Sequence, residues 1–384
     1  MGYFGRTFRR WIVMKKEIKF ETVGELFCGP GGGGIGSSLA QVSKDNIDLM
    51  IKHIWASDID IDSCDTYKKN IETYQSETLG INEPVNVICG DVNDEEIDLN
   101  DVNQFPYVDG LLFGFPCNDF SLVGESKGLK GKFGPLYKHG ISVITRKQKP
   151  KWFVAENVSG LSSSNDGKAF KQILSEMIGA GYSLTAHKYR FEEYGVPQSR
   201  HRIIIVGIRN DLKLSFSVPA PVGKIVTAKE ALSDIPENLS HQELTKQSKN
   251  VVERLKHIKP GENAWNSELP EHLKLNVPRT QLSHIYKRLH PDKPAYTVTG
   301  SGGGGTHMYH WEEPRALTNR ERARLQTFPD WYEFSGNKES VRKQIGMAIP
   351  PLGVKLICEA ILKTLNGMSY PSVASNINIS KILA

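Results

Sequence analysis

The 384-residue sequence has few cysteines and no long apolar run, and each shortage excludes certain classes of protein. Its five cysteines are scattered, without a C-x-x-C pair or a Cys/His cluster at zinc spacing. This predicts a reducing compartment, no disulfide frame and no metal site. No apolar stretch approaches the roughly 20 residues of a membrane span, so we expect no membrane association and a cytoplasmic location. The formal net charge of +5 is compatible with a polyanionic partner but does not establish one.

Between about residues 14 and 210 the sequence alternates between strand-like and helical patterns. The alternation predicts an α/β fold with a parallel sheet of the nucleotide-binding type. Helices are expected at residues 37–42, 61–74 and 166–181, and Thr318 and Glu321 are spaced as the capping box of a later helix. Apolar runs predict strands at residues 19–27, 53–59, 85–89, 108–115, 152–155, 183–191 and 203–208.

The alternation ends near Asn210, which predicts a second, smaller domain. Residues 211–306 are polar and irregular and contain several prolines. An apolar helix near 352–365 is expected to return to the first domain, which would then comprise residues 14–210 and 307–384. We expect residues 1–13 to be a disordered extension, and the chain after about Tyr370 to be a polar tail.

The apolar run 108–115 predicts a buried strand, and a cysteine follows shortly after it. Pro116 ends this strand because proline cannot donate to a sheet ladder. Cys117 would then stand where open α/β sheets bind their ligands, and a glycine- and lysine-rich stretch follows it. Cys117 is therefore a candidate nucleophile behind a mobile lid. The alternative is that Cys117 is a small buried apolar residue.

A glycine turn follows the strand 19–27, where Phe27 leads into Cys28-Gly29-Pro30-Gly31-Gly32. Glycines let a ligand approach the backbone closely and leave helix N–H groups free for an acceptor. Asp58 ends the next strand, near the position of the acid that holds ribose hydroxyls in dinucleotide folds. Asp58 and Asp60 could instead cap the following helix. Asp91, after the third strand, could accept a hydrogen bond from an amine of a bound base.

Further charged residues follow the later strands. Glu156 ends the strand 152–155, and it is either a functional carboxylate or a structural ion pair. Arg200 and Arg202 are two residues apart at the foot of a strand, so we expect both to project to one side, towards a phosphate or a base edge. A surface ion-pair role is the alternative. Residues 241–288 carry nine Lys/Arg and five Asp/Glu, which indicates either a nucleic-acid docking surface or a solvated face.

Taken together and in order, these motifs resemble those of the DNA (cytosine-5) methyltransferases, from about residue 20 to 366. Any one motif is weak evidence for this family, but the whole set in this order is specific for it. The matching stretches are Glu25-Leu26-Phe27-Cys28-Gly29-Pro30-Gly31-Gly32, Gly114-Phe115-Pro116-Cys117 with Phe120-Ser121, Glu156-Asn157-Val158, Gln198-Ser199-Arg200-His201-Arg202, Thr297-Val298-Thr299, Leu325-Gln326-Thr327-Phe328-Pro329 and Gln344-Ile345-Gly346.

The resemblance implies a Rossmann-like S-adenosylmethionine-dependent methyltransferase sheet, with a target recognition domain at residues 211–306. It implies methyl transfer to C5 of a cytosine flipped out of a specific short duplex DNA sequence, leaving S-adenosylhomocysteine. Cys117 would attack C6 and Glu156 would act at N3, while Arg202 and Arg200 would hold the cytosine O2 and a nearby phosphate.

The resemblance also implies binding residues. Asn118 and Ser121 would contact DNA, and Arg279 is a candidate base reader. The family usually has glutamine where Asn118 stands and asparagine where Met347 stands, so the contacts carried over at these positions are open. The implied cofactor contacts are Phe27, Gly29, Gly31, Gly32, Asp58, Ile59, Asp91, Val92, Gly114 and Pro116.

We expect a monomer that acts on double-stranded DNA in the bacterial cytoplasm, associated with the nucleoid. Functional pairing with a restriction endonuclease is expected, without a stable complex. The alternative substrate is tRNA, although the related tRNA enzymes have a much reduced recognition region. A catalytically silent binding module would not explain why Cys117 and Glu156 occur together. A nicotinamide dehydrogenase could share the early glycine turn, but it would not explain the motifs after residue 110.

Overall fold

The computed structural model describes residues 17–115, 136–158, 160, 167–276, 284–303 and 305–384. Two compact units make up the described chain. The sheet unit comprises residues 17–190, 201–221 and 353–384, and the irregular unit comprises residues 191–200 and 222–352. The domain boundaries expected from the sequence, at residues 211 and 306, stay a prediction.

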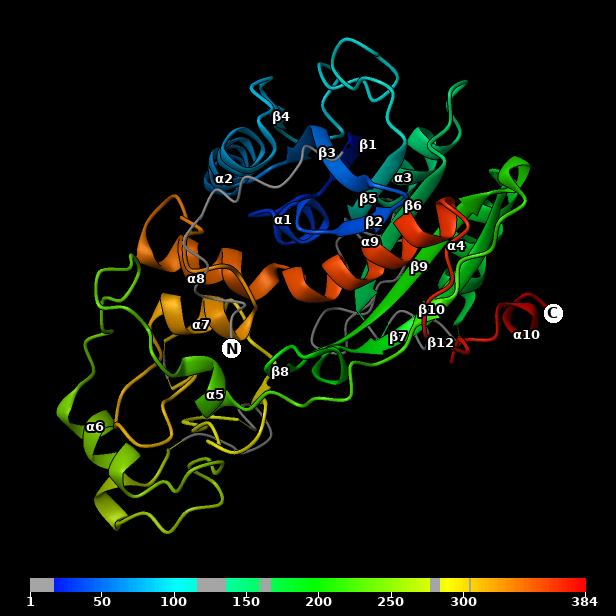
Figure 1. Cartoon of the computed structure of the whole chain (residues 1–384). Coiled ribbons are helices and arrows are strands. Elements are labelled where there is room, and N and C mark those ends of the chain that lie inside the picture. The colour runs from blue at the N-terminus through cyan, green and yellow to red at the C-terminus, as the bar shows by residue number, and fades with distance from the viewer. Residues whose placement is uncertain (1–16, 116–135, 159, 161–166, 277–283, 304) are drawn as a thin grey trace. The chain divides into compact units, whose positions relative to one another are not determined.

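An eight-stranded mixed sheet forms the centre of the sheet unit (Figure 1). Its strand order is β2-β3-β1-β5-β6-β9-β7, and β4 pairs with β3. The pairs β4–β3, β3–β1, β1–β5 and β5–β6 are parallel, whereas β2, β9 and β7 pair antiparallel to their neighbours. The strands are β1 (Glu17–Leu26), β2 (Gln41–Lys44), β3 (Ile47–Asp58), β4 (Asn86–Cys89), β5 (Gly110–Gly114), β6 (Trp152–Val158), β7 (Tyr182–Arg190) and β9 (His201–Arg209).

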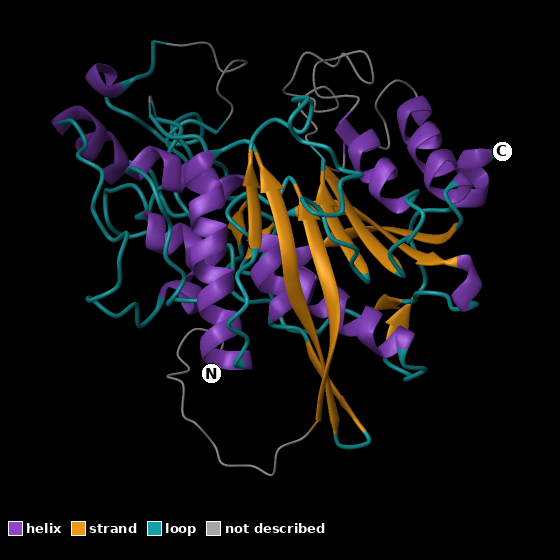
Figure 2. Cartoon of the chain, turned by 90° about the horizontal axis from the view of Figure 1, so that it is seen from above, coloured by secondary structure: helices purple, strands orange, loops and turns teal. Residues whose placement is uncertain are grey.

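Helices pack against this sheet, whose strands lie side by side in Figure 2. The helices α1 and α2 contact β3, while α4 contacts β7. A short antiparallel pair, β10 (Val218–Pro219) with β12 (Ser372–Val373), completes the unit. The helices are α1 (Gly32–Ser38), α2 (Ile61–Leu79), α3 (Tyr137–Ile144), α4 (Lys168–Gly179), α9 (Pro351–Leu365) and α10 (Ile379–Leu383).

Both faces of the central strands are buried, which explains why they read as continuous apolar runs rather than alternating ones. One face carries Phe113 and Phe153, which belong to a large cluster that also contains residues of α3 and α4. The opposite face carries Glu25, Leu112 and Val154, since side chains alternate along a strand. The sheet thus has the Rossmann-like parallel centre that the sequence predicts, whereas β2, β9 and β7 correct the expectation of an all-parallel sheet.

The expected position of the first helix is wrong. The first helix is Gly32–Ser38 rather than residues 37–42, because the glycines themselves form the helix. The chain then enters β2, which pairs with β3 through a tight turn at Asp45 and Asn46. Both turn residues have positive φ, 48° and 65°, as a two-residue hairpin requires.

The C-terminal segment is not merely a polar tail. Helix α10 contacts α4 and β7, and Asn378 accepts a hydrogen bond from Lys381 N as its N-cap. Ile379, Ile382 and Leu383 pack against the main apolar cluster. Three apolar side chains in a polar context gave too little periodicity to predict this short helix.

The irregular unit has short helices and few strands. Its helices are α5 (Ala228–Leu232), α6 (Lys249–Lys256), α7 (Asn319–Leu325) and α8 (Lys338–Met347), and β8 (Gln198–Ser199) pairs in parallel with β11 (Ala295–Tyr296). The capping box of Thr318 and Glu321 is confirmed at the start of α7. A small apolar cluster forms around Leu255, Ile258 and Tyr309.

The span Lys338–Leu365, which contains α8 and α9, is long enough to cross a membrane and contains a window apolar enough to do so. No stretch of this kind was expected from the sequence. In the structure 67% of its most apolar window is buried inside the protein. That burial is typical of a core helix, and a single span of this kind is weak evidence for a membrane segment.

Helix α3 packs so closely on the sheet that Gly140→Ala should destabilise the protein. A Cβ at Gly140 would lie 2.4 Å from the ring of Phe113. Overpacking of this kind costs about 1–3 kcal/mol. Gly179→Ala, at the end of α4, is the matched control because a Cβ there meets nothing within 4 Å. Urea unfolding should show a lower free energy for Gly140→Ala only, and equal stability of the two variants would contradict this packing.

Candidate cofactor and catalytic site

The glycine turn between β1 and α1 forms a tight loop at the carboxyl end of the sheet. Phe27, Gly29 and Gly31 all have positive φ, at 56°, 52° and 86°. Gly31 N donates to Cys28 O at 3.1 Å, which closes the turn. A Cβ at Gly29 would meet nothing within 4 Å, so the backbone there borders open space. The turn therefore has room for a ligand to approach its backbone.

Asp58 holds this turn from the end of β3. Its Oδ2 accepts from Gly29 N at 2.8 Å, and its Oδ1 accepts from Asp60 N at 3.0 Å. Burial raises the pKa of Asp58, and these backbone hydrogen bonds oppose the rise. The capping alternative holds for Asp60, which accepts from Ser63 N at the start of α2, but not for Asp58.

The ends of β3 and β4 carry three further predicted cofactor residues, Ile59, Asp91 and Val92. Gly90 N donates to Asp58 O at 3.0 Å, which places Asp91 and Val92 just beyond the end of β3. Ile59 is 68% exposed, a large apolar side chain beside these polar groups. Asp91 Oδ1 accepts from the backbone and side chain of Asn93. An exposed apolar surface flanked by two carboxylates fits an adenosine: a flat ring with ribose hydroxyls.

A buried polar chain lies beneath the glycine helix, and sequence reasoning gave it no role. The carboxyl group of Glu25 hydrogen bonds with Tyr67. Tyr67 Oη lies 2.7 Å from His53 Nδ1, and Ser37 Oγ lies 2.8 Å from His53 Nε2. Ser37 Oγ donates to the carbonyls of Gly33 and Gly34. The chain thus links β1, α2, β3 and α1.

Burial decides the protonation of this chain. It raises the pKa of Glu25 to about 8 and lowers the pKa of His53 to about 3. With Glu25 protonated and His53 neutral, each of the four side chains can donate once, in the order Glu25, Tyr67, His53, Ser37. A Cβ on Gly33 would lie 2.3 Å from Glu25 Oε1, so a glycine is required there.

The predicted catalytic carboxylate forms an ion pair across neighbouring strands. Arg202 Nε lies 2.7 Å from Glu156 Oε1, and the two side chains are 15% and 22% exposed. Arg202 faces Val158 in the β6–β9 pairing, two residues beyond Glu156 on the same face. The other oxygen, Oε2, lies 3.3 Å from where a Cβ of Gly114 would be. A side chain at Gly114 would crowd this carboxylate.

Asn157 fixes the end of β5, a role that the sequence did not reveal. It is buried, and its Nδ2 donates to Phe115 O at 3.2 Å. Its Oδ1 accepts from Val158 N at 2.9 Å. Phe115 is the last described residue before Pro116 and Cys117. Asn157 therefore sets where the chain leaves the sheet towards the predicted nucleophile.

Arg200 has different surroundings from those expected. It lies between β8 and β9, so the strand spacing on which its pairing with Arg202 rested does not apply. Its buried guanidinium donates to Val298 O at 3.0 Å and to Met347 O at 3.4 Å. Gln198 similarly donates to Leu325 O. These contacts join four of the motif segments within the irregular unit.

Several predicted residues lie outside the described part of the chain: Pro116, Cys117, Asn118, Ser121 and Arg279. Arg288, counted in the basic segment, is a buried residue that donates to the carbonyls of Leu255, Ile258 and His310. It therefore cannot belong to a docking surface.

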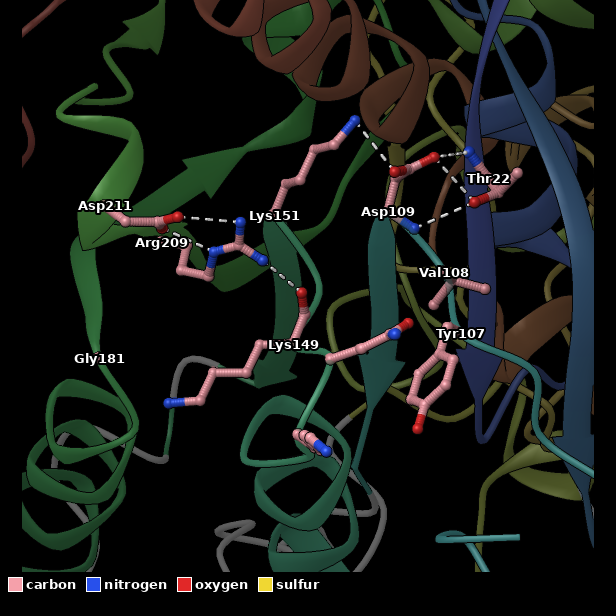
Figure 3. Close-up of a pocket in the computed structure, with 11 residues that line it drawn as sticks. Thr22, Tyr107, Val108, Asp109, Lys149, Lys151, Gly181, Arg209 and Asp211 are labelled. Carbon is pink, nitrogen blue, oxygen red and sulfur yellow. Dashed lines mark hydrogen bonds and ion pairs between the residues drawn. The ribbon is translucent and has the colours of Figure 1, made fainter. Parts of the chain in front are cut away.

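A cavity of about 680 Å³ lies at the opposite end of β5 and β6 from these strand ends (Figure 3). Lys151 pairs with Asp109 at 3.0 Å, and Arg209 pairs with Asp211 at 2.6 Å. Asp109 also accepts from the backbone N–H and hydroxyl of Thr22. These charges are neutralised locally, and the cavity contains none of the predicted site residues.

Comparison with known proteins identifies the family. The family model for C-5 cytosine-specific DNA methylases matches residues 22–363. The chain belongs to this family. It is 53% identical to the type II methyltransferase M.BbvI of Brevibacillus brevis, over 94% of this chain and 96% of that protein. It is 40% identical to M.NgoFVII of Neisseria gonorrhoeae, over 88% and 85% of the two chains.

The chain is accordingly a DNA (cytosine-5-)-methyltransferase of the restriction-modification type. Its fold is similar to the solved structure of the Entamoeba histolytica methyltransferase EhMeth, with a TM-score of 0.60 at 15% identity, covering 91% of this chain and 98% of that one. Membership of this family implies that the enzyme uses S-adenosylmethionine.

The raised pKa of Glu25 predicts a specific pH dependence in this methyltransferase. Between pH 4.5 and about 8 the folded state holds a proton that the unfolded state has lost, so stability falls as pH rises. Glu25→Gln removes this dependence and keeps the chain neutral. Between about pH 6.5 and 8, the wild type should lose about 1–2 kcal/mol more than the variant in urea unfolding.

Working above about pH 6.5 avoids the titration of His53, whose lowered pKa affects stability only below that value. Glu96→Gln removes an exposed carboxyl group and should keep the wild-type profile. Parallel profiles for wild type and Glu25→Gln would show that Glu25 is ionised in the folded protein.

Proposed function

We propose that this enzyme methylates C5 of a cytosine flipped out of a specific short duplex DNA sequence, through a covalent bond between Cys117 and C6. The observation that carries this proposal is the Glu156–Arg202 ion pair beside Gly114. It lies at the carboxyl end of β5, from which the chain continues to Cys117. A carboxyl group at that place, in its protonated form, can donate to N3 of a cytosine under attack at C6.

The proposed cofactor site lies on the adjacent strand ends. The methionine portion would lie over Phe27, Gly29, Gly31 and Gly32, where the open backbone at Gly29 supports close approach. The ribose would contact Asp58, and the adenine would lie between Ile59, Asp91 and Val92. Gly114 and Pro116 are the remaining candidate cofactor contacts. When bound, S-adenosylmethionine supplies the methyl group for the reaction.

Each side chain in the mechanism has a defined task. The Cys117 thiolate adds to C6, forming the S–C6 bond and shifting the C5–C6 electron pair towards C5. Glu156 donates a proton or hydrogen bond to N3, where negative charge develops. After C5 is methylated, a base removes the C5 proton, the double bond re-forms and Cys117 leaves as thiolate. The N3 proton then returns to Glu156.

Arg202 orients the acid. Its Nε holds Glu156 Oε1, which leaves Oε2 for the base, and its Nη1 donates to His201 O. Arg202 is also a candidate contact for the cytosine O2. Because Arg200 bonds to backbone carbonyls, its contacts support a positioning role for two segments, one that contains Val298 and one that contains Met347.

We place target recognition within residues 211–306, with Arg279 as a candidate base reader and Asn118 and Ser121 as candidate DNA contacts. We further propose a monomer in the bacterial cytoplasm, at the nucleoid. It would protect sites from a paired restriction endonuclease without forming a stable complex with it.

Duplex DNA containing 5-fluorocytosine tests the reaction. Fluorine at C5 blocks the final elimination, so labelled S-adenosylmethionine should leave a covalent enzyme–DNA adduct that survives denaturation. Cys117→Ala should abolish the adduct, because no thiolate adds to C6. Glu156→Gln should slow adduct formation by about 100-fold or more, as is typical for loss of general acid catalysis.

Methyl transfer to ordinary DNA without a trapped adduct would contradict the covalent mechanism. If neither occurs on DNA but both occur on tRNA, the substrate is RNA and the alternative holds. Mapping the adduct would identify the target cytosine.

Asp58→Ala should weaken S-adenosylhomocysteine binding by about tenfold or more, equivalent to about 1.4 kcal/mol. It removes the proposed ribose contact and releases Gly29 N. Asp60→Ala is the matched control: it removes the α2 cap, should cost about 1 kcal/mol of stability and should leave the affinity nearly unchanged. Calorimetric titration with S-adenosylhomocysteine measures the affinity of each variant. Equal affinities of the two variants would show that Asp58 does not belong to the binding site.

A further inference from the structure

Two cysteines lie together at the carboxyl end of the sheet, beside the proposed adenosine site. Cys89 ends β4 and is exposed, whereas Cys64 is buried in the first turn of α2. The two thiols form a hydrogen bond with each other. Neither cysteine belongs to a motif of the sequence analysis, and neither takes part in the proposed reaction.

Backbone contacts fix the position of this cysteine pair. Cys89 faces Asp58 in the parallel β3–β4 register, and Gly90 N donates to Asp58 O at 3.0 Å. Cys64 Sγ donates to the same carbonyl at 3.4 Å, so its sulfur lies beside the backbone at the end of β4. Cys89 Sγ lies 4.0 Å from Ile59 O. The two sulfurs therefore contact successive carbonyls of the segment that supplies Asp58 and Ile59 to the proposed cofactor site.

The two thiols differ in their access to solvent. Cys89 lines a cavity of about 500 Å³, so a small oxidant can reach it. Cys64 lies behind it in α2, where burial and the neighbouring Cys89 thiol raise the pKa of Cys64. An exposed thiol that is oxidised first, with a second thiol next to it that resolves the product, is the usual arrangement of a redox-sensitive cysteine pair.

We propose that Cys64 and Cys89 form a reversible disulfide that lowers the affinity of the enzyme for S-adenosylmethionine. Hydrogen peroxide is the oxidant: it converts the Cys89 thiol to a sulfenic acid and releases one water. The Cys64 sulfur then bonds to the Cys89 sulfur, the S–O bond breaks, and the hydroxyl group leaves with the Cys64 proton as a second water. One peroxide thus takes two electrons from the thiol pair. In a reducing compartment such a disulfide is transient.

The disulfide would disturb the proposed cofactor site from behind. An S–S bond is about 2.05 Å long, shorter than the contact between two separate thiols, so the start of α2 and the end of β4 must approach each other. The Cys64 sulfur also loses the proton that it donates to Asp58 O. The segment of Asp58 and Ile59 should shift as a result, which weakens its contacts with ribose and adenine. This effect on affinity rests on the proposed cofactor site, whereas formation of the disulfide does not.

Peptide mapping tests the disulfide. The parent protein is Cys117→Ala, because Cys117 can itself react with peroxide and shares a tryptic fragment with Cys89. Trypsin cuts after Lys68 and Lys69, between the two cysteines of the pair. After peroxide treatment and alkylation of the remaining thiols, the two cysteine-containing fragments should stay joined, with a mass two hydrogen atoms below their sum. Dithiothreitol should separate them.

Calorimetric titration with S-adenosylhomocysteine tests the effect on affinity. The oxidised parent should bind about 5- to 10-fold more weakly than the reduced parent, and dithiothreitol should restore the affinity. Cys89→Ser in the same parent should bind equally with and without peroxide, and Cys64→Ser replaces it if it does not fold. Cys358→Ala, which removes a buried cysteine of α9, is the matched control and should keep the full response to peroxide.

The absence of joined fragments after peroxide treatment would overturn the proposal, as would an unchanged affinity once the fragments are joined. Equal loss of affinity in Cys89→Ser would also overturn it, because oxidation elsewhere would then be responsible. Failure of the reduced wild type to bind S-adenosylhomocysteine would instead reject the proposed cofactor site and, with it, the effect on affinity. The peptide mapping decides in that case whether the disulfide itself forms.

Discussion

The antiparallel pairing of β9 with β6 is the constraint on which the candidate active site depends. Its register sets Arg202 opposite Val158, and Arg202 reaches Glu156 on the same face. A slip of one residue would turn Arg202 to the other face of the sheet and leave Glu156 without its partner. The parallel β5–β6 pairing then brings Gly114 beside Glu156. The pairing of Glu156 with Arg202 beside Gly114 is therefore set by strand register.

The cofactor end of the sheet depends on a second set of fixed contacts. Asp58 binds Gly29 N from above the turn, while the buried chain that begins at Glu25 supports the glycine helix from below. Gly33 must lack a side chain because Glu25 occupies that space. A neutral buried carboxyl group avoids most of the desolvation cost of an ionised one. The glycine turn is thus held in place before any ligand binds.

The sequence predicted the elements with strong local signals. Strands β1, β5, β6 and β9 and the capping box at Thr318 followed from apolar runs and spacing. The glycine helix was misplaced because glycine has low intrinsic helix propensity, and tertiary contacts to Glu25 and Tyr67 override it here. The α10 helix was missed because its stability comes from packing against the main core.

The site residues divide in the same way, into those that the local sequence identifies and those whose roles depend on the fold. Glu156 and Arg202 could be named from the sequence, but their ion pair depends on a register between strands far apart in the chain. Arg200 and Arg288 read as available cations, yet both are buried against backbone carbonyls that only the fold brings near. Local sequence spacing does not show whether an arginine is buried. Because arginine is mostly exposed in proteins, both residues were expected at the surface.

The most direct test of the account is whether Glu156 and Arg202 act as one unit. A double-mutant cycle would compare kcat/KM for DNA methylation in Glu156→Gln, Arg202→Gln and the double variant, with thermal unfolding to confirm folding. If Arg202 works by holding the acid, the double variant should lose about as much as the worse single variant, because one function is lost in each. Losses that multiply would show independent roles and contradict the account.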